Sequence, residues 1–215
     1  EPTGLVGLRA ILPGVPAGLA LSGRRGEYAA VATGSEIWTW ADGGLPDEVA
    51  RRLTLPGEAV SGPLLHEDGG TYALVAQPAG VALCRIDDQS RVSFCLETGF
   101  TTAAISSERA PVLGRSGLVY APFVARASLL PQYGGVMAVS AAGLRYRQEL
   151  AVPPEQLSLT LQWSGLATLA AAGETMLWQL DGGSTTDSHE YNAWPQRDGN
   201  PAGSLRRWQS AGVTN

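Results

Sequence analysis

Four times along the chain, the sequence repeats the same order of short apolar runs separated by turn residues. Each unit has an apolar run, a turn containing Gly, a second run that often holds Tyr, a third run led by Gly, and a more polar fourth run. Short runs bounded by Gly, Pro, Asp and Ser are typical of β-strands. The second runs are 27–32, 71–76, 118–123 and 166–170, and the third runs are 36–40, 81–86, 136–140 and 175–180.

The spacing of this repeat predicts the architecture. The third runs follow Gly34, Gly80, Gly135 and Gly173, which are 46, 55 and 38 residues apart. A β-propeller blade of four antiparallel strands takes about 40–45 residues. We therefore expect an all-β chain of about four blades, at 5–58, 59–100, 101–152 and 153–190, followed by a C-terminal tail or closing segment at 191–215. The alternative is a β-sandwich of eight or more strands, which similar alternation would also produce.

The best helix signal in the chain is short. In segment 45–53, Pro46 stands at a first-turn position, two acids come early, and Arg51 and Arg52 come late, as helix ends favour. This pattern predicts two turns at most. Helix should therefore make up less than about a tenth of the chain, against about a third in ordinary domains.

The third repeat carries a more specific pattern. Gly117-Leu118-Val119-Tyr120, followed by a loop and the segment 135–146 (GVMAVSAAGLRY), resembles the quinoprotein-type (PQQ-like) propeller repeat, which reads GxVY and then gxlyAlDaxtGxxxW. Ser140 stands where that family has Asp, and Tyr146 where it has Trp. Segment 61–72 is similar to the opening of such a blade. Segment 194–203 (WPQRDGNPAG) resembles a segment found beside these propellers, so the resemblance covers about residues 20–205.

The resemblance implies a larger ring than four blades. Closed propellers have 4–8 blades, and the PQQ-like family usually has seven or eight. The sequence begins at Glu1 without Met, so we expect these blades to be part of a larger ring. Half a ring leaves two unmatched blade faces, and further protein must cover their apolar surface.

The two cysteines lie on either side of a short polar turn. A hairpin centred on Gln89 and Ser90 pairs residue 88 with 91, 86 with 93, and Cys84 with Cys95. Opposed residues have Cα atoms about 4.5–5.5 Å apart, which a disulfide accepts. We therefore predict a Cys84–Cys95 disulfide and a periplasmic or extracellular location, including the cell surface. The alternative is a pair of buried thiols in a reducing cell.

Composition excludes several function classes. All fifteen cations are Arg, so a Walker A lysine, a kinase strand lysine, a Schiff-base lysine and a Ser-Lys dyad are ruled out. The net charge of −5 argues against nucleic acid as a main partner. No stretch approaches the roughly 18 apolar residues of a membrane-spanning helix.

Only His66 and His189 could act as imidazole bases. His66 lies where a strand enters a turn, and His189 lies in a polar loop beside Asp187 and Ser188. Adjacent Asp, Ser and His do not form a catalytic triad, because triad members meet from separate elements. There is also no GxSxG elbow. We interpret both histidines as surface residues of polar turns and predict no catalytic residue.

Two acidic loops offer oxygen ligands for calcium. They are 181–190 and 198–200, and neither has the EF-hand spacing of alternate acids with Glu at the twelfth position. Because Asp and Gly are favoured turn residues, the preferred interpretation is turns and no metal site, with calcium left open.

Six tryptophans raise the question of aromatic binding surfaces. Trp38 and Trp40 lie two residues apart and so share one face of their strand. In a propeller that face packs on the neighbouring blade, and the alternative is an exposed platform for sugar or protein. Trp194 and Trp208 lie in the tail and are the better candidates for contacts with a partner.

The family resemblance also raises the question of a quinone cofactor. The resemblance implies, for a PQQ enzyme, an eight-bladed ring with acidic and basic residues and a calcium ion at the central funnel. Here the tryptophan docking motif is degenerate in every repeat, no Lys is available, and half a ring at most is present. We therefore expect no cofactor.

Together these observations predict a non-catalytic β-propeller scaffold or protein-binding subunit of a secreted or cell-envelope assembly. Its partners would be other subunits or the remaining blades of the same propeller. The alternatives are part of a propeller enzyme whose active site lies in a segment not present here, and a carbohydrate-binding surface protein.

Overall fold

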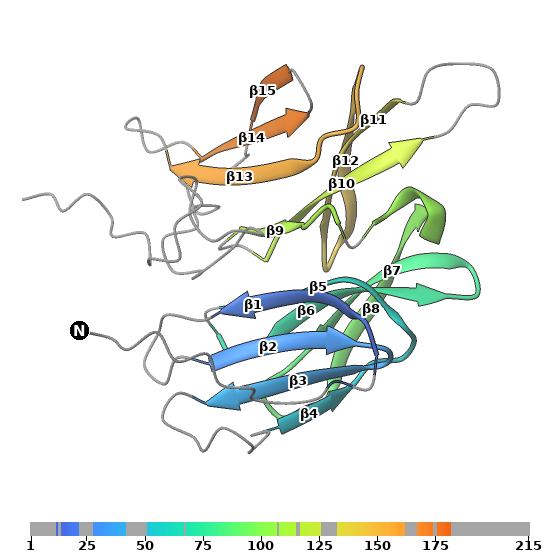
Figure 1. The fold of residues 1–215 in the computed structure, drawn as a ribbon, viewed down its shortest axis with the longest axis vertical. Helices are drawn as coiled ribbons and strands as arrows, with labels where there is room; N and C mark the ends of the chain where they lie inside the picture. The colour runs from blue at the N-terminus through green and yellow to red at the C-terminus, as the bar shows by residue number, and fades with distance from the viewer. Residues whose placement is uncertain are drawn as a thin grey trace, which may run out of the picture.

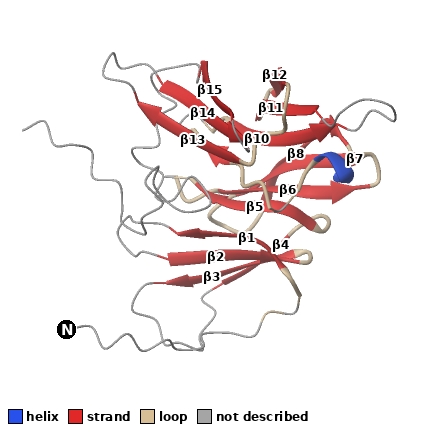
Figure 2. Cartoon of the chain, turned by 45° about the horizontal axis from the view of Figure 1, so that its top comes forward, coloured by secondary structure: helices blue, strands red, loops and turns tan. Residues whose placement is uncertain are grey.

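The computed structural model describes residue 12 and residues 14–21, 28–41, 51–66, 68–106, 108–114, 117–125, 133–161, 167–173 and 176–181. Within these ranges the only helix is η1 (Thr102–Ala104), a single 3-10 turn of three residues. Strands make up most of the rest, as Figure 2 shows in red. The predicted all-β fold is confirmed, and no described helix is long and apolar enough to cross a membrane.

The strands form four separate antiparallel sheets, each built from consecutive strands in chain order. Sheet 1 consists of β1 (Pro16–Leu21), β2 (Tyr28–Thr33), β3 (Glu36–Ala41) and β4 (Arg51–Thr54). Sheet 2 consists of β5 (Ala59–Leu65), β6 (Thr71–Gln77), β7 (Gly80–Ile86) and β8 (Val92–Phe100). Sheet 3 consists of β9 (Val112–Leu113), β10 (Val119–Ala125), β11 (Tyr133–Ser140) and β12 (Gly143–Leu150). Sheet 4 consists of β13 (Gln156–Leu161), β14 (Ala167–Gly173) and β15 (Met176–Asp181).

The sheets stack in series, and a hydrophobic core lies between each successive pair. The first core joins Ile37 of sheet 1 to Val75 of sheet 2, and the second joins Leu74 of sheet 2 to Phe123 of sheet 3. The third lies between sheets 3 and 4 and contains Leu157. A sandwich has two sheets around one core, so this series of four sheets rules out the sandwich alternative.

The first strands of neighbouring sheets contact one another. β1 contacts β5, β5 contacts β9, and β9 contacts β13, so the first strands follow one another through the molecule. In both Figure 1 and Figure 2, sheets 1 and 4 lie at opposite ends of the stack. Within the described residues the four sheets are therefore blades arranged in series, and the strands of each lie within 5–58, 59–100, 101–152 and 153–190.

The glycines that lead the third strands have two different roles. Gly34 and Gly80 have positive φ angles of 54° and 137° at the tight turns before β3 and β7, as the sequence predicts. Gly135 instead lies inside β11, directly opposite Phe123. A Cβ atom there would lie 2.8 Å from the Phe123 ring and would collide with the Gln148 carbonyl oxygen. That position needs glycine for close packing rather than for a turn.

The helix predicted over 45–53 is wrong for the part of that segment that the structure describes. Residues 42–50 lie outside the described ranges, but Arg51, Arg52 and Leu53 belong to strand β4. Leu53 is fully buried in the core between sheets 1 and 2. Pairing with β3 and burial of Leu53 outweigh the weak local preference for helix.

Candidate functional site

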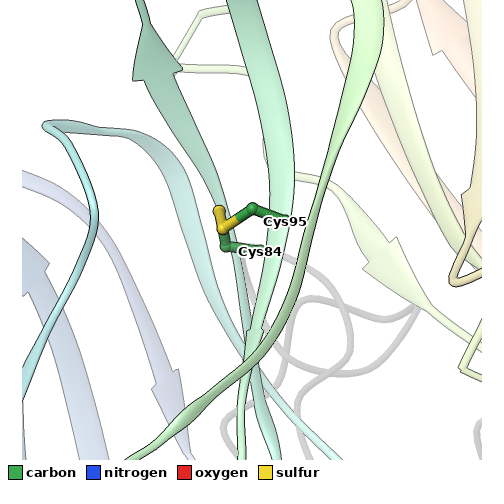
Figure 3. The surroundings of a disulfide bond; sticks show 2 residues. All are labelled: Cys84 and Cys95. Carbon is green, nitrogen blue, oxygen red and sulfur yellow. A yellow bond between two sulfur atoms is a disulfide. The ribbon is translucent and has the colours of Figure 1, made fainter.

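The disulfide joins the last two strands of sheet 2. Cys84 on β7 lies directly opposite Cys95 on β8, and the sulfur atoms are 2.02 Å apart. The Cα atoms are 4.1 Å apart, and Figure 3 shows the bond bridging the two adjacent strands. Cys84 is buried in the core between sheets 1 and 2, whereas Cys95 is exposed. The predicted bond is confirmed.

The hairpin around the disulfide differs from the predicted one by a single residue. The turn runs from Asp87 to Arg91, because the Asp87 N–H donates to the Arg91 carbonyl at 2.9 Å. Ser90 has a positive φ of 67°, and the Asp87 carboxylate accepts the N–H groups of Gln89 and Arg91 at 2.9 and 2.8 Å. Ile86 consequently pairs with residue 92 instead of 93, and a register shift next to Arg85 restores the cysteine pair. Such three-residue loops with a bulge are common in hairpins.

A polar cluster lies at the turn between β5 and β6. Asp68 accepts a 2.6 Å ion-pair contact from Arg85, and its other oxygen lies 2.9 Å from His66 Nδ1 and 2.8 Å from the Gly70 N–H. The Asp68 backbone nitrogen also lies 3.4 Å from Nδ1. A hydrogen bond there would require the His66 tautomer that carries no proton on Nδ1. The shorter carboxylate contact is the stronger one, so the Nδ1–H group of His66 donates a hydrogen bond to the Asp68 carboxylate.

Burial and charge set the protonation of this cluster. Burial alone would raise the pKa of Asp68, but the Gly70 hydrogen bond, His66 and Arg85 outweigh it and hold that pKa below its usual value. Burial raises the pKa of Tyr72, although the nearby Arg85 opposes the shift. Asp68 is therefore an ionised anchor at neutral pH, and its contacts with His66, Gly70 and Arg85 hold the turn together.

His66 lies in a turn, as predicted, but it is not a surface residue. Its side chain is only 10% exposed, because the ring packs edge-on against Tyr72 with centroids 6.0 Å apart. The apolar pattern did not point to Tyr72, which packs on His66, or to Arg85, which pairs with Asp68. These two residues are direct cross-strand partners, so the tight turn before Gly80 was a signal that could have placed them together.

The second candidate surface is the outer face of sheet 1, which points away from sheet 2. It is defined by Leu19, Val31, Trp38, Trp40 and Arg52, and the first four of these are apolar. Leu19, Val31, Trp38 and Arg52 are successive cross-strand partners and form one row across the sheet. The row connects all four strands, so the face is a continuous surface.

The two tryptophans share a face, as predicted, but that face does not pack on the next blade of this chain. Ile37, between Glu36 and Trp38, belongs to the core with sheet 2, so Trp38 and Trp40 point the other way. The Trp38 indole N–H donates to Glu36 at 2.7 Å, and the Arg52 guanidinium lies 4.3 Å from the ring centroid. Trp38 is 8% exposed, which also argues against a free aromatic platform for sugar.

The outer face still has incomplete contacts within the described residues. Leu19 is 58% exposed. The Trp40 Nε1 atom is buried and has no hydrogen-bond acceptor in the described part of the chain. An apolar patch beside an unpaired N–H group is typical of a surface that another chain segment or protein covers.

Several predicted residues lie outside the described ranges. They are His189, Trp194, Trp208, most of the 181–190 loop and the 198–200 loop. Their assigned roles stay predictions. Among the residues that the structure does describe, no group of three His, Cys, Asp or Glu side chains is placed to hold a metal ion.

No protein-family model and no curated protein matches this sequence. Among solved structures, the chain is similar to hydrazine synthase from Kuenenia stuttgartiensis, with a TM-score of 0.55 and 18% sequence identity. The match covers 77% of this chain and 52% of that chain, so this chain spans about half the length of its structural neighbour. Hydrazine synthase contains β-propeller domains. At this identity the likeness concerns the fold alone, and with the four-stranded sheets it identifies the fold as propeller blades.

Proposed function

We propose that this chain is a non-catalytic β-propeller scaffold of the PQQ-like repeat type that binds further protein in a secreted or cell-envelope assembly. The observation that carries the proposal is the outer face of sheet 1. There, Leu19 is 58% exposed beside the largely buried Trp38, on the face of sheet 1 that lies opposite the core with sheet 2. An exposed apolar side chain on a sheet face that no described sheet covers favours an interface.

The occupant we assign to this face is a further β-sheet, stacked as sheets 2 and 3 are stacked on their neighbours. Continuity of the series supports this choice, because each described sheet packs its apolar face against the next. The open arrangement of the stack in Figures 1 and 2 also supports it. The structural neighbour, in which the match covers only half of the chain, is consistent with such an arc inside a larger assembly.

The cellular location rests on the disulfide. The Cys84–Cys95 bond is compatible with an oxidising compartment, and we propose the periplasm or the cell exterior. The non-catalytic assignment rests on chemistry. The chain has no Lys, and the contact of His66 with Asp68 belongs to a turn that Asp68 anchors.

The proposal is tested by the mass of the purified 215-residue chain in solution. Light scattering coupled to size exclusion should give particles larger than 22.4 kDa, because the apolar face has to be covered. Leu19→Glu should shift them towards the monomer. Leu144→Glu is the matched control, since Leu144 is a leucine on β12 with 46% exposure that lies outside the proposed face.

Two results would overturn the proposal. One is a stable, soluble monomer across a wide concentration range with the same elution for the wild type and the Leu19→Glu variant. The other is a measured catalytic turnover by the purified chain.

A further inference from the structure

The last strand of sheet 1 lies against the disulfide-bonded hairpin of sheet 2. Leu53 of β4 is fully buried, in the same core as Cys84 of β7. Two residues earlier, on the same face of β4, the Arg51 guanidinium donates hydrogen bonds to the carbonyl oxygens of Asp88 and, at 3.3 Å, Asp87. β4 therefore meets the hairpin at two places, which are the core that contains Cys84 and the tip of the turn.

The hydrogen bonds of Arg51 cross from one sheet to the other and depend on the position of the tip. Its Nε atom is buried and has no acceptor among the described residues, so the guanidinium relies on the two carbonyl groups. The tip is a rigid unit, because the Asp87 carboxylate accepts two of its backbone N–H groups. Between the tip and the disulfide, the β7–β8 ladder has a register shift next to Ile86. The Cys84–Cys95 bond therefore helps to set how β8 and the tip lie against β7.

β4 has little local support of its own. It has four residues, whereas the strands of sheet 2 have seven to nine. Its first three residues end the segment 45–53, whose sequence favours helix. Where local preference and observed structure disagree, packing decides the conformation. The strand conformation of β4 therefore depends on its contact with sheet 2.

We propose that the Cys84–Cys95 disulfide is a redox switch for the docking of β4. While the bond is intact, the hairpin presents its two carbonyl groups to Arg51 and β4 stays docked. Reduction frees the hairpin, so the Arg51 hydrogen bonds are lost and β4 is released from sheet 2. Since β4 also carries Arg52 over the Trp38 ring, its release changes the outer face of sheet 1 as well.

The reductant is a dithiol, which acts from the side of the exposed Cys95. Its thiolate attacks Cys95 Sγ and forms a mixed disulfide, while Cys84 leaves and takes up a proton. The second thiol of the reductant then attacks its own sulfur in the mixed disulfide, and Cys95 is released as a thiol. Two electrons and two protons thereby pass from the dithiol, which becomes a disulfide, to the two cysteines.

The switch goes beyond the proposed function and does not require it. The proposed function is tested by the mass of the particle, whereas the switch is tested by backbone protection of β4 and by the redox equilibrium of the disulfide. Either idea can fail while the other stands.

Hydrogen exchange of backbone amides, read by mass spectrometry on the full chain, tests the release of β4. Full reduction with dithiothreitol should speed exchange of peptides covering 51–54 about tenfold and leave β10 and β11 of sheet 3 unchanged. The double variant Cys84→Ala/Cys95→Ala is the matched control, since it should exchange fast at β4 with or without dithiothreitol.

Two results of this experiment would overturn the proposal. One is unchanged exchange of β4 in the fully reduced chain. The other is equal acceleration in sheets 1 and 3, because the bond would then hold the whole fold and not β4 in particular.

The reverse effect provides a second test, because coupling between two sites is reciprocal. If reduction weakens the docking, weaker docking must favour reduction by the same factor. Arg51→Met should shift the equilibrium between disulfide and thiols, measured in mixtures of reduced and oxidised dithiothreitol, about fivefold or more towards the thiols. Arg91→Met, at an exposed position of the same turn, is the matched control and should cause no shift. The same equilibrium in wild type and the Arg51 variant would show that the disulfide and the docking are independent, and the proposal would be wrong.

Discussion

Sheets 1 and 2 have the same strand number and order but opposite surroundings. Sheet 2 buries both faces: Val75 contributes to the core with sheet 1, and Leu74 contributes to the core with sheet 3. Sheet 1 buries one face through Ile37, while its other face leaves Leu19 58% exposed. The difference comes from position in the series and not from strand chemistry.

Interior and end sheets of such a stack have the same apolar pattern in the sequence. In β6, five successive residues are buried, because neighbouring sheets cover alternate side chains on both faces. In sheet 1 the outer face is just as apolar, with Val31 opposite Trp38. An end sheet whose outer face is as apolar as that of an interior sheet is therefore typical of an interface that no described sheet covers.

The largest expected effect is at a core between two sheets. Phe123→Ala removes a fully buried ring between sheets 2 and 3, whose centroid lies 4.8 Å from the centroid of the Phe100 ring. The free energy of unfolding should fall by about 3–5 kcal/mol in urea titration. Leu19→Ala, on the outer face of sheet 1, is the control and should change it by less than about 0.5 kcal/mol. A similar loss for both variants would mean that the outer face is already part of a core.

The second effect concerns the clamp on sheet 2. Replacing both Cys84 and Cys95 with Ala should lower the free energy of unfolding by about 3 kcal/mol, because the bond closes a loop that otherwise adds entropy to the unfolded chain. Reductant should weaken the wild type and leave the double variant unchanged. Free thiols titrated in the native, non-reduced protein would contradict the bond itself.

The disulfide and the strand order show how much of this fold the sequence contains. A short hairpin between the two cysteines brings Cys84 opposite Cys95, because the register shift beside Arg85 offsets the extra residue of the turn. The one-residue error in the turn arose because the Asp87 side chain accepts two backbone N–H groups. That preference for a bulged loop is not visible in an apolar pattern.

Contacts between sheets were harder to predict than pairing within them. Alternation places Trp38 and Trp40 on one face, but it does not say which sheet that face meets. The interpretation of His66 as a surface residue failed within one sheet. Its ring packs against Tyr72, and Arg85 pairs with Asp68, the residue that contacts His66; the apolar pattern carries no signal for these side-chain contacts.

A smaller effect tests the outer face of sheet 1 directly. Arg52→Ala removes the guanidinium that lies over the Trp38 ring. It should lower the free energy of unfolding by about 0.5–1 kcal/mol and make Trp38 more accessible to a fluorescence quencher. Arg145→Ala, at an exposed position on β12, is the control for loss of a rim charge. Unchanged quenching in the Arg52 variant would show that something else covers the ring.

The smallest expected effect is a pH dependence of the free energy of unfolding. It concerns sheet 2 and not sheet 1, because the Asp68 cluster belongs to sheet 2. The pKa of Asp68 is held below its usual value in the folded chain. Its stabilising contribution is therefore present above the unfolded pKa of about 3.9, and it is lost as the pH falls through the lower folded pKa. Because Asp68 is 47% exposed, the contribution should be about 1 kcal/mol or less.

Asp68→Asn should lower the free energy of unfolding at pH 7, and its difference from wild type should shrink on acidification. Ser93→Ala removes only the 3.4 Å contact to Arg85 and should keep the wild-type pH profile. A constant difference between wild type and Asp68→Asn from pH 7 to 3 would mean that the carboxylate charge has no part in holding the turn.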